Sequence, residues 1–455
     1  MINPLTKEKF FSDKEFYKTM FNIAIPISIQ NVISSSLNMV DTIMIGSLGA
    51  TCVASVGIAN RLFFILILLL FGISTGATVF TSQYWGKKDI PNIRKVLGMA
   101  LSSSLFVGFI MMVVMLTIPH LVMSIFTKDS EIIKYGSLFL KINSISFVFT
   151  SITFTYAFIC RSTGNTKLPM FITIFCLGIN TLLNYCLIFG NFGFPQMGVA
   201  GAAISTNIAR FFECFFLILL IYLNNYPAAA KIREMRFDFS FFKNFLKTTM
   251  PIISNEFFWV IGITIYSIIY ARMGTNEIAA ISIISPIESI AIGIFFGLAN
   301  ACSIMLGNQL GINNNSKADK YAKRFIRLGL VFSIFFGILL IIFADKILSF
   351  YKVDKVIIDL SKNILIILCI FLWIKIFNMI TIVGILRSGG DVKFSLFMDT
   401  GAVWVFGVPL VFIAAFILKL PLPLVYLLSM FEEVVKGCLG IFRIYSKKWI
   451  KNLVG

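Results

Sequence analysis

The chain has 455 residues, of which 58% are hydrophobic and 13% are charged, and its formal net charge is +18. So little polar surface cannot cover a soluble body of this size, which places the chain in a lipid bilayer. The positive charge fits contact with anionic lipid headgroups. We therefore expect membrane lipids, and no nucleic acid, among its partners.

Twelve apolar stretches follow one another along the chain, each long enough for a helix to cross about 30 Å of hydrocarbon. Lipid offers no hydrogen-bond partner to a bare backbone, so we predict that each stretch is a transmembrane helix. Uniformly apolar runs such as 62–72 exclude a β-barrel, whose strands alternate in polarity. The sequence predicts an all-α membrane protein with spans at 20–47, 53–83, 94–118, 132–160, 168–189, 198–224, 246–272, 278–309, 322–344, 357–385, 394–418 and 421–445.

The two halves of the chain repeat each other. From residue 26 to residue 86 the sequence matches itself at an offset of 225, which pairs Pro26 with Pro251, Gly72 with Gly297 and Gly86 with Gly311. A second block, at an offset of 226, pairs the motif that begins at Arg161 with the motif that begins at Arg387. Duplicated apolar halves are typical of transporters that rock one half against the other. We expect two pseudo-symmetric six-helix lobes, 1–224 and 246–455, joined by a cytoplasmic linker at 225–245.

Basic residues are concentrated in alternate loops. Placing both termini in the cytoplasm puts most of the 39 lysine and arginine residues on the inner side, as the positive-inside rule requires. The first twenty residues lack a short apolar core with a cleavage site, so we expect no signal peptide to be removed. The predicted location is the bacterial cytoplasmic membrane, which the chain crosses many times, and we expect a monomer.

The sequence patterns of common enzyme sites are missing. There is no P-loop, no dinucleotide-type glycine run and no cluster of His, Asp and Glu with metal-ligand spacing. We therefore predict a protein that is not an enzyme, needs no cofactor and does not itself use ATP to drive transport.

Ionisable residues inside the spans are few, and each costs at least a few kcal/mol unless it is paired or hydrated. Arg210 and Glu213 lie three apart and Glu432 and Lys436 four apart, so we expect each pair to neutralise itself on one helix face. These two pairs favour a structural interpretation over a functional one.

Asp41 differs because its own helix carries no basic residue within one turn. It lies roughly 10 Å below the outer end of its span, and Asn184 and Asn180 lie at roughly 8 and 14 Å in span five. A carboxylate and two amides supply hard oxygen ligands for a small cation, while a lone carboxylate can also carry a proton. We predict ion or proton coupling at Asp41, Asn180 and Asn184, with Na+ as the only candidate metal ion. The alternative is that the asparagines only bridge helices.

Pro26 and Pro251 occupy matching places near the cytoplasmic ends of spans one and seven. A missing N–H and a ring clash favour bending at such positions. We predict hinges at both prolines; static kinks that only set the packing are the alternative.

The order of several motifs resembles the MATE family of multidrug and toxic compound extrusion transporters. The resemblance runs over nearly the whole chain and rests on Pro26-Ile27, Asp41-x-x-x-x-Gly46, Gln83-Tyr84-Trp85-Gly86, Arg161-Ser162-Thr163-Gly164-Asn165, Gly198-Val199-Ala200-Gly201-Ala202-Ala203, Leu386-Arg387-Ser388-Gly389-Gly390-Asp391 and Lys447-Lys448-Trp449. It implies a V-shaped pair of lobes and export of amphipathic, often cationic small molecules, driven by inward flow of Na+ or H+ as the coupling ion.

The same resemblance places the family's acidic position of span one on Asp41 and its Asn-x-x-x-Asp of span five on Asn180 and Asn184. The amide at 184 departs from that pattern and leaves Asp41 as the titrating group of the site. The family's frequent carboxylates in spans seven and ten fall near Glu256 and the basic Lys375. Both lie about 15 Å from the inner ends of their spans, so we predict an ion pair that switches during transport, with Glu256 as counter-charge for a cationic substrate.

Two other classes of function stay open. A flippase for lipid-linked precursors, from the wider superfamily, would share the helical repeats but line its cavity with more cationic side chains. A channel is a weaker alternative, because channels take their symmetry from several subunits and show a repeated filter sequence.

Overall fold

The computed structural model describes residues 13–351 and 353–455. Within these ranges the chain forms helices and connecting loops, with no strand. The helices of the first half are α1 (Lys14–Gly46), α2 (Ala50–Gly86), α3 (Ile90–Thr117), α4 (Pro119–Ser124), α5 (Ser130–Asn143), α6 (Ser146–Ser162), α7 (Lys167–Phe189), the 3-10 turn η1 (Asn191–Gly193) and α8 (Val199–Leu223).

The second half repeats this order, with short π-helical segments inserted in two of its helices. It contains α9 (Phe239–Met273), α10 (Thr275–Gly311), α11 (Asn315–Ile342), α12 (Ala344–Leu348), α13 (Lys355–Met379), η2 (Ile380–Leu386), α14 (Val392–Gly401), η3 (Ala402–Gly407), α15 (Val408–Phe412), η4 (Ile413–Ile417), α16 (Leu422–Ser429) and α17 (Phe431–Tyr445).

Each of the twelve predicted spans corresponds to one helix or to a run of consecutive helical segments. In the described ranges, ten helices are long and apolar enough to cross a membrane, and α5 with α6, bent by 52° at their junction, forms an eleventh. The twelfth stretch is broken at Met430 into α16 and α17, and α17 carries four charged residues. Several of the observed helices extend past a predicted end; α9, for example, begins at Phe239 instead of 246. Apolar length marks the lipid-facing part, whereas a helix continues through the polar interface.

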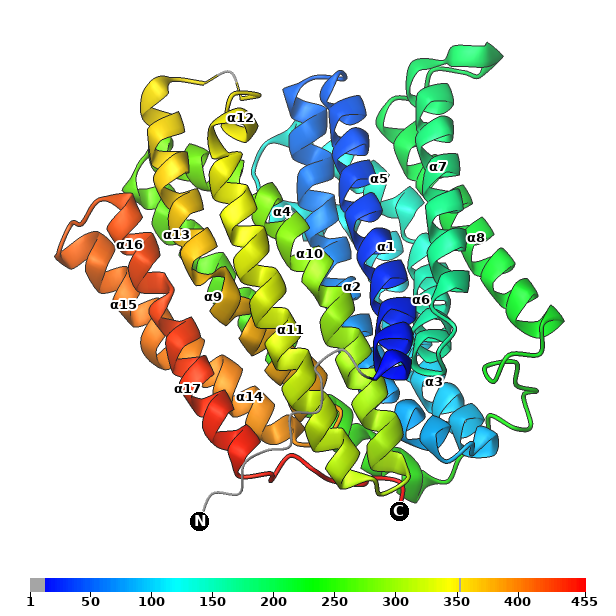
Figure 1. The fold of residues 1–455 in the computed structure, drawn as a ribbon. Helices are drawn as coiled ribbons and strands as arrows, with labels where there is room; N and C mark the ends of the chain where they lie inside the picture. Colours follow the sequence, from blue (N-terminus) through cyan, green and yellow to red (C-terminus); the bar gives the residue numbers. More distant parts are fainter. Residues whose placement is uncertain (1–12, 352) are drawn as a thin grey trace.

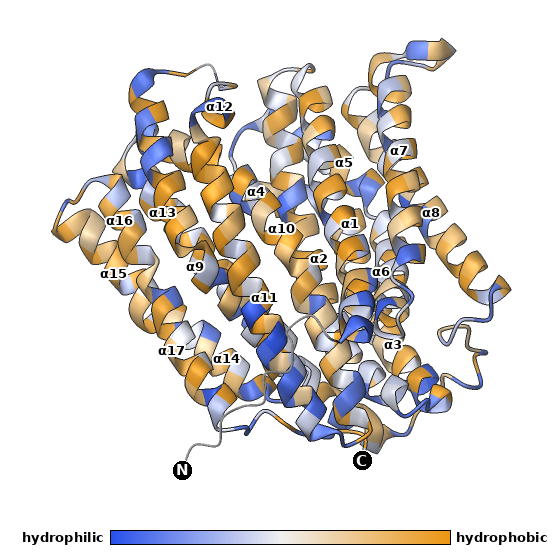
Figure 2. Ribbon diagram, in the orientation of Figure 1, coloured by the Kyte–Doolittle hydropathy of each residue, from blue (hydrophilic) through white to orange (hydrophobic). Residues whose placement is uncertain are grey.

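We name the two ends of the helix bundle by where the first and last helices begin and end. Figure 1 shows that α1 begins and α17 ends at the same end, where Asp13 caps α1 by accepting a hydrogen bond from the Phe16 N–H at 3.1 Å. We call this end the terminal face and the opposite end the far face. The helices are mostly hydrophobic along their middle lengths, and hydrophilic residues gather toward the terminal face (Figure 2).

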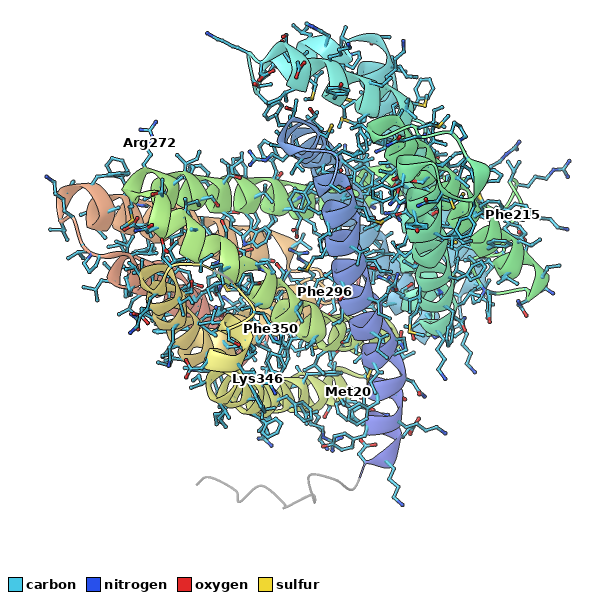
Figure 3. All side chains as sticks on the ribbon, turned by 90° about the horizontal axis from the view of Figure 1, so that it is seen from above. Met20, Phe215, Arg272, Phe296, Lys346 and Phe350 are labelled. Atoms are coloured by element: carbon cyan, nitrogen blue, oxygen red, sulfur yellow. The ribbon has the colours of Figure 1, made fainter. Side chains whose placement is uncertain are left out.

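The two halves pack through α1, α2, α9 and α10. Helix α1 lies along α10, and α2 lies along both α9 and α10. Buried residues of α1 and α10 share one hydrophobic cluster, which includes Met20 and against which the partly buried Phe296 packs; both are labelled in Figure 3. The contact therefore crosses between halves, because α1 has few contacts with its own neighbour α2.

The repeated glycines lie in this contact. A Cβ atom on Gly72 would stand 2.7 Å from the Ile253 side chain, and one on Gly297 would meet Ser28, the residue that the 225 offset pairs with Ile253. The same reciprocity holds toward the terminal face, where Gly86 faces Asn308 and Gly311 faces Gln83. Ser82 faces Gly307, its own repeat partner, so the pseudo-twofold axis passes between them. The glycines recur in both halves because each permits close approach of two backbones.

The segment after α17 crosses from one half to the other at the terminal face. Trp449 is fully buried, Leu453 N donates to Gln83 Oε1 at 2.8 Å, and Asn452 Nδ2 donates to the Gly311 carbonyl at 3.3 Å. Asp391 anchors the segment by accepting hydrogen bonds from Arg443 and Lys451. Burial alone would raise the pKa of Asp391, but these two cations hold it below its usual range.

Candidate functional site: a polar cavity in the first half

The predicted coupling residues line a cavity of about 460 Å³ between α1, α2, α5, α7 and α8. All of its walls come from the first half of the chain. The polar side chains that line it include the predicted coupling residues Asp41, Asn180 and Asn184 and the predicted ion pair of Arg210 and Glu213. Asn60, Asn143 and Thr206 line it as well. Aromatic rings of Phe63, Phe64 and Phe139 complete the lining. The structure thus brings Asp41, Asn180 and Asn184 together.

Asp41 accepts a hydrogen bond on each carboxylate oxygen. Asn184 Nδ2 donates to Oδ1 at 2.8 Å. With the Asn180 amide turned so that its nitrogen faces Asp41, that nitrogen donates to Oδ2 at 3.0 Å, and its oxygen accepts from Thr206 N at 3.3 Å. The Asn184 oxygen accepts a hydrogen bond from the Ser205 hydroxyl. Both amides therefore present N–H groups to the carboxylate and point their oxygens away, which differs from the cluster of three oxygen ligands expected from the sequence.

Arg210 and Glu213 form the predicted ion pair, with Arg210 Nη1 2.7 Å from Glu213 Oε2. Sequence reasoning assigned this pair a structural role and missed that both side chains line the cavity with Asp41. Asn60 and Asn143 were also missed. Their only signal in the sequence was an amide inside an apolar span, which is also the pattern of an ordinary bridge between helices.

The predicted pair of Glu256 and Lys375 is wrong in its geometry. Glu256 instead accepts from Arg387 Nη2 at 2.7 Å, and Lys375 pairs with Glu288. Equal depth along two helices does not make their side chains face each other. Lys375 lies on α13, which packs against α10, the helix that carries Glu288.

A second network of buried charges connects α14 with α17. Lys436 Nζ lies 2.9 Å from Asp399 Oδ1 and 3.3 Å from Glu432 Oε1, so the pairing predicted for Glu432 and Lys436 is confirmed. A third carboxylate, on Glu433, lies 3.8 Å from the same ammonium. One lysine thus serves three acids that are all nearly excluded from solvent.

Pro26 lies inside α1, where it is buried. Without an N–H it cannot bond the carbonyl of Asn22, four residues earlier. The Thr166 hydroxyl donates to that carbonyl at 2.8 Å instead. Pro251 lies inside α9, and the 226 offset places Val392, which has no hydroxyl, at the position of Thr166. The first proline is therefore supported from another helix in a way that position 392 cannot reproduce.

No group of three or more His, Cys, Asp or Glu side chains suitable for a metal ion occurs among residues 13–351 and 353–455. Asp41 has amides and a hydroxyl network around it, so a bound cation there would have one protein carboxylate as its charged ligand.

Two repeated six-helix halves with charged side chains buried between their helices define a multi-pass membrane protein of the transporter class. The model of the family described as MatE matches residues 26–186 and 251–413, once in each half. The chain therefore belongs to the MatE family, and it is a multi-pass protein of the bacterial plasma membrane.

Individual relatives agree with this assignment. The chain is 25% identical to "Probable multidrug resistance protein NorM" of Thermotoga maritima, over 99% of this chain and 96% of the relative. It is 29% identical to the protein of the same name from Bacillus anthracis, over 86% of each. A solved structure described as the outward-facing conformation of a multidrug resistance MATE family transporter matches with a TM-score of 0.86 at 20% identity, covering 95% of this chain and 97% of that one. A MATE structure in a bent conformation matches with a TM-score of 0.84, at the same identity.

Proposed function

We propose that the protein exports amphipathic or cationic small molecules from the cell by secondary active transport, coupled to inward flow of Na+ or H+. The two six-helix lobes, 1–224 and 246–455, would alternate access by rocking about their shared contact, with 225–245 as the connecting segment. The observation that carries the proposal is Asp41, a carboxylate held by two amides in a cavity inside one half. We take the monomer as the transporting unit.

The proposed sidedness follows from charge. Basic residues are concentrated at the terminal face, which we assign to the cytoplasm by the positive-inside rule, and both chain termini are then cytoplasmic. The far face is then outside. On this assignment Asp41, five residues before the end of α1, lies about 8 Å along the helix from the outer end.

The orientation of the amides favours a proton over sodium at Asp41. Both carboxylate oxygens already accept N–H groups, so a sodium ion would require at least one amide to rotate its oxygen inward. A proton can bind the carboxylate without that rearrangement. Ionised Asp41 would be stabilised by its two donors in one state, and protonation would release them in the other.

The second half would supply negative charge for a cationic substrate. Its connected acids, Glu256, Glu288, Asp399, Glu432 and Glu433, outnumber the cations that pair with them, Lys375, Arg387 and Lys436. Glu256 and Lys375 would contribute to this net charge, each through the partner that it has in the structure: Arg387 for Glu256 and Glu288 for Lys375. An excess of buried negative charge is stabilised by a cation, and a lipophilic cation would fit both the charge and the membrane setting.

The experiment is ethidium efflux from vesicles containing the purified protein, with sodium and proton gradients imposed separately. Asp41→Asn should abolish gradient-driven efflux because the side chain can no longer take up a cation, while the protein still inserts. Asp345→Asn, the same change at an exposed residue on α12, is the matched control and should leave efflux unchanged. Wild-type rates in Asp41→Asn would remove Asp41 from the mechanism. Equal rates with either gradient and with none would remove ion coupling.

A further inference from the structure

A chain of hydrogen bonds runs from the cavity toward the terminal face. Arg161 Nη2 donates to Gln30 Oε1 at 2.7 Å, and Gln30 Nε2 donates to Thr173 Oγ1 at 2.9 Å. The Thr173 hydroxyl then donates to Glu213 Oε1 at 2.8 Å, and Arg210 Nη1 donates to Glu213 Oε2 at 2.7 Å. These hydrogen bonds connect α6, α1, α7 and α8 in turn. Glu213 supplies the carboxylate in this chain of hydrogen bonds.

Glu213 lies at the deep end of the same cavity that holds Asp41. Counted from Val199, where α8 begins at the far face, it is about 21 Å along the helix, against about 8 Å for Asp41 on α1. The two carboxylates are thus separated by about 13 Å in depth within one cavity. A cation that moves from Asp41 to Glu213 would cross a large part of the membrane.

The net charge of the groups around Glu213 changes when a cation binds. Glu213 is 4% exposed, and the charged groups that approach it are Arg210 on its own helix, Arg161 on α6 and Asp41 across the cavity. Its other neighbours, Thr173 and Gln30, are neutral, as is Cys176 on α7. With both acids ionised this set carries no net charge, and a bound cation leaves it one charge positive. A cationic substrate is then repelled from a loaded cavity, as exchange transport requires.

The second half contains a related but interrupted set of contacts, in which a base, Lys436, takes the place of Glu213. The 225 and 226 offsets carry Gln30 to Asn255, Thr173 to Asp399 and Arg161 to Arg387. Asn255 again donates to Asp399, but Arg387 donates to Glu256, the residue next to Asn255. Glu213 and Lys436 each lie fourteen residues after the first residue of their span, Val199 and Leu422. Lys436 bonds Asp399 as Glu213 bonds Thr173. An ammonium cannot take up a cation, so only the first half can carry one through this position.

We propose that Glu213 is a second stop for the coupling cation, which it receives from Asp41 and passes toward the terminal face. If the cation is a proton, its bond to a carboxylate oxygen of Asp41 breaks, water in the cavity carries it as hydronium, and a bond to Glu213 Oε2 forms. Arg210 leaves Glu213 and pairs with the ionised Asp41, so charge is conserved. A sodium ion would make the same exchange of carboxylates. Thr173, Gln30 and Arg161 position Glu213. This inference rests on the proposed coupling at Asp41.

The test compares Asp41→Asn, Glu213→Gln and Glu213→Asp in vesicles, with ethidium as the probe and sodium and proton gradients imposed in separate arms. Glu213→Gln should bind ethidium within about twofold of wild type but lose about tenfold or more of gradient-driven efflux, together with the accompanying cation influx. Glu213→Asp, which keeps the carboxylate, should recover most of the rate. Glu131→Gln, an exposed residue on α5, is the matched control.

The outcomes separate this inference from the proposed function. If wild type moves no ethidium with either gradient, the coupling proposal fails first. If wild type is driven and Asp41→Asn is inactive, but Glu213→Gln couples as wild type does, then Glu213 is not a stop and this inference alone is overturned. The arm in which efflux is driven identifies the cation.

A second variant keeps the test decisive if Glu213→Gln does not fold. Thr173→Val removes the hydroxyl bond but leaves the Glu213 and Arg210 pair in place. The proposal expects the cation concentration for half-maximal efflux to shift about threefold or more, with ethidium binding unchanged, and expects Thr173→Ser to restore it. An unshifted dependence in folded Thr173→Val overturns the inference.

Discussion

Two buried arginines explain why the Arg-Ser motif occurs in both halves. Arg161 reaches Gln30 on α1, and Arg387 reaches Glu256 on α9, so each ties the end of a span to the helix that contacts the opposite half. Arg387 is 2% exposed, and its partner makes the pair a buried one. Removing one member of such a pair strands the other charge in the membrane interior.

This pairing gives the first prediction at the scale of single residues. Arg387→Met should lower the free energy of unfolding by about 3 to 5 kcal/mol because Glu256 loses its counter-charge. Adding Glu256→Gln to Arg387→Met should recover most of that loss. Adding Lys375→Met to Glu256→Gln should recover none of the stability that Glu256→Gln alone loses. Thermal unfolding of the purified variants in detergent measures the difference. Recovery in the second double variant, and none in the first, would instead support a Glu256–Lys375 contact.

Among the helices, α1 carries the clearest device for bending. Its Pro26 frees the Asn22 carbonyl, and Thr166, just before α7, satisfies that carbonyl. The helix can therefore bend there without leaving a buried acceptor unpaired, which otherwise costs about 1 to 3 kcal/mol. Hinge action at Pro26 and Pro251 is our hypothesis for how the lobes change their opening.

Pro26→Ala tests the hinge. Alanine restores the helical hydrogen bond and straightens α1, so we expect ethidium turnover to fall severalfold while ethidium binding stays close to wild type. Pro91→Ala is the matched control, because Pro91 lies in the first turn of α3, where its N–H would have no helical partner. Binding and turnover both equal to wild type would identify Pro26 as a static kink.

The sequence predicts the helices better than it predicts the contacts between side chains. All twelve spans follow from apolar length, and the shared depth of Asp41 and Asn184 is consistent with the contact that the structure shows. The partners of Glu256 and Lys375 do not follow from depth, because depth leaves the rotation of each helix undetermined. The bond from Thr166 to Asn22 had no signal either, since it depends on how a loop meets a kink.

For the whole molecule, the glycine contacts between the halves bring the two lobes close together at the terminal face. Gly86 and Gly311 allow α2 and α10 to approach until the backbone of each glycine lies against the backbone of the opposite helix. The segment from Trp449 to Leu453 lies over this contact and bonds both halves. Closure at this face is therefore a property of both lobes together and of neither alone.

Gly311→Val should hold the terminal face open, because its Cβ would meet the Gln83 carbonyl and overpacking costs about 1 to 3 kcal/mol. Val79→Cys, buried between the halves near Ile252, reports the change in a background without other cysteines. We expect maleimide to label it several times faster in Gly311→Val. Gly57→Val, whose Cβ meets nothing within 4 Å, is the control. Equal labelling in both variants would show that the face does not depend on this contact.

The contact of Ser82 with its own repeat partner, Gly307, has a consequence for the origin of the chain. When two residues face each other across this interface, their repeat counterparts face each other as well. The interface is therefore self-complementary, as in a symmetric dimer. Six crossings return each half to the side where it began, so two copies of one half would insert in the same direction. A single ancestral half could thus have assembled as a homodimer before gene fusion. Only after fusion could one copy keep an acid at Glu213 while the other acquired a base at Lys436.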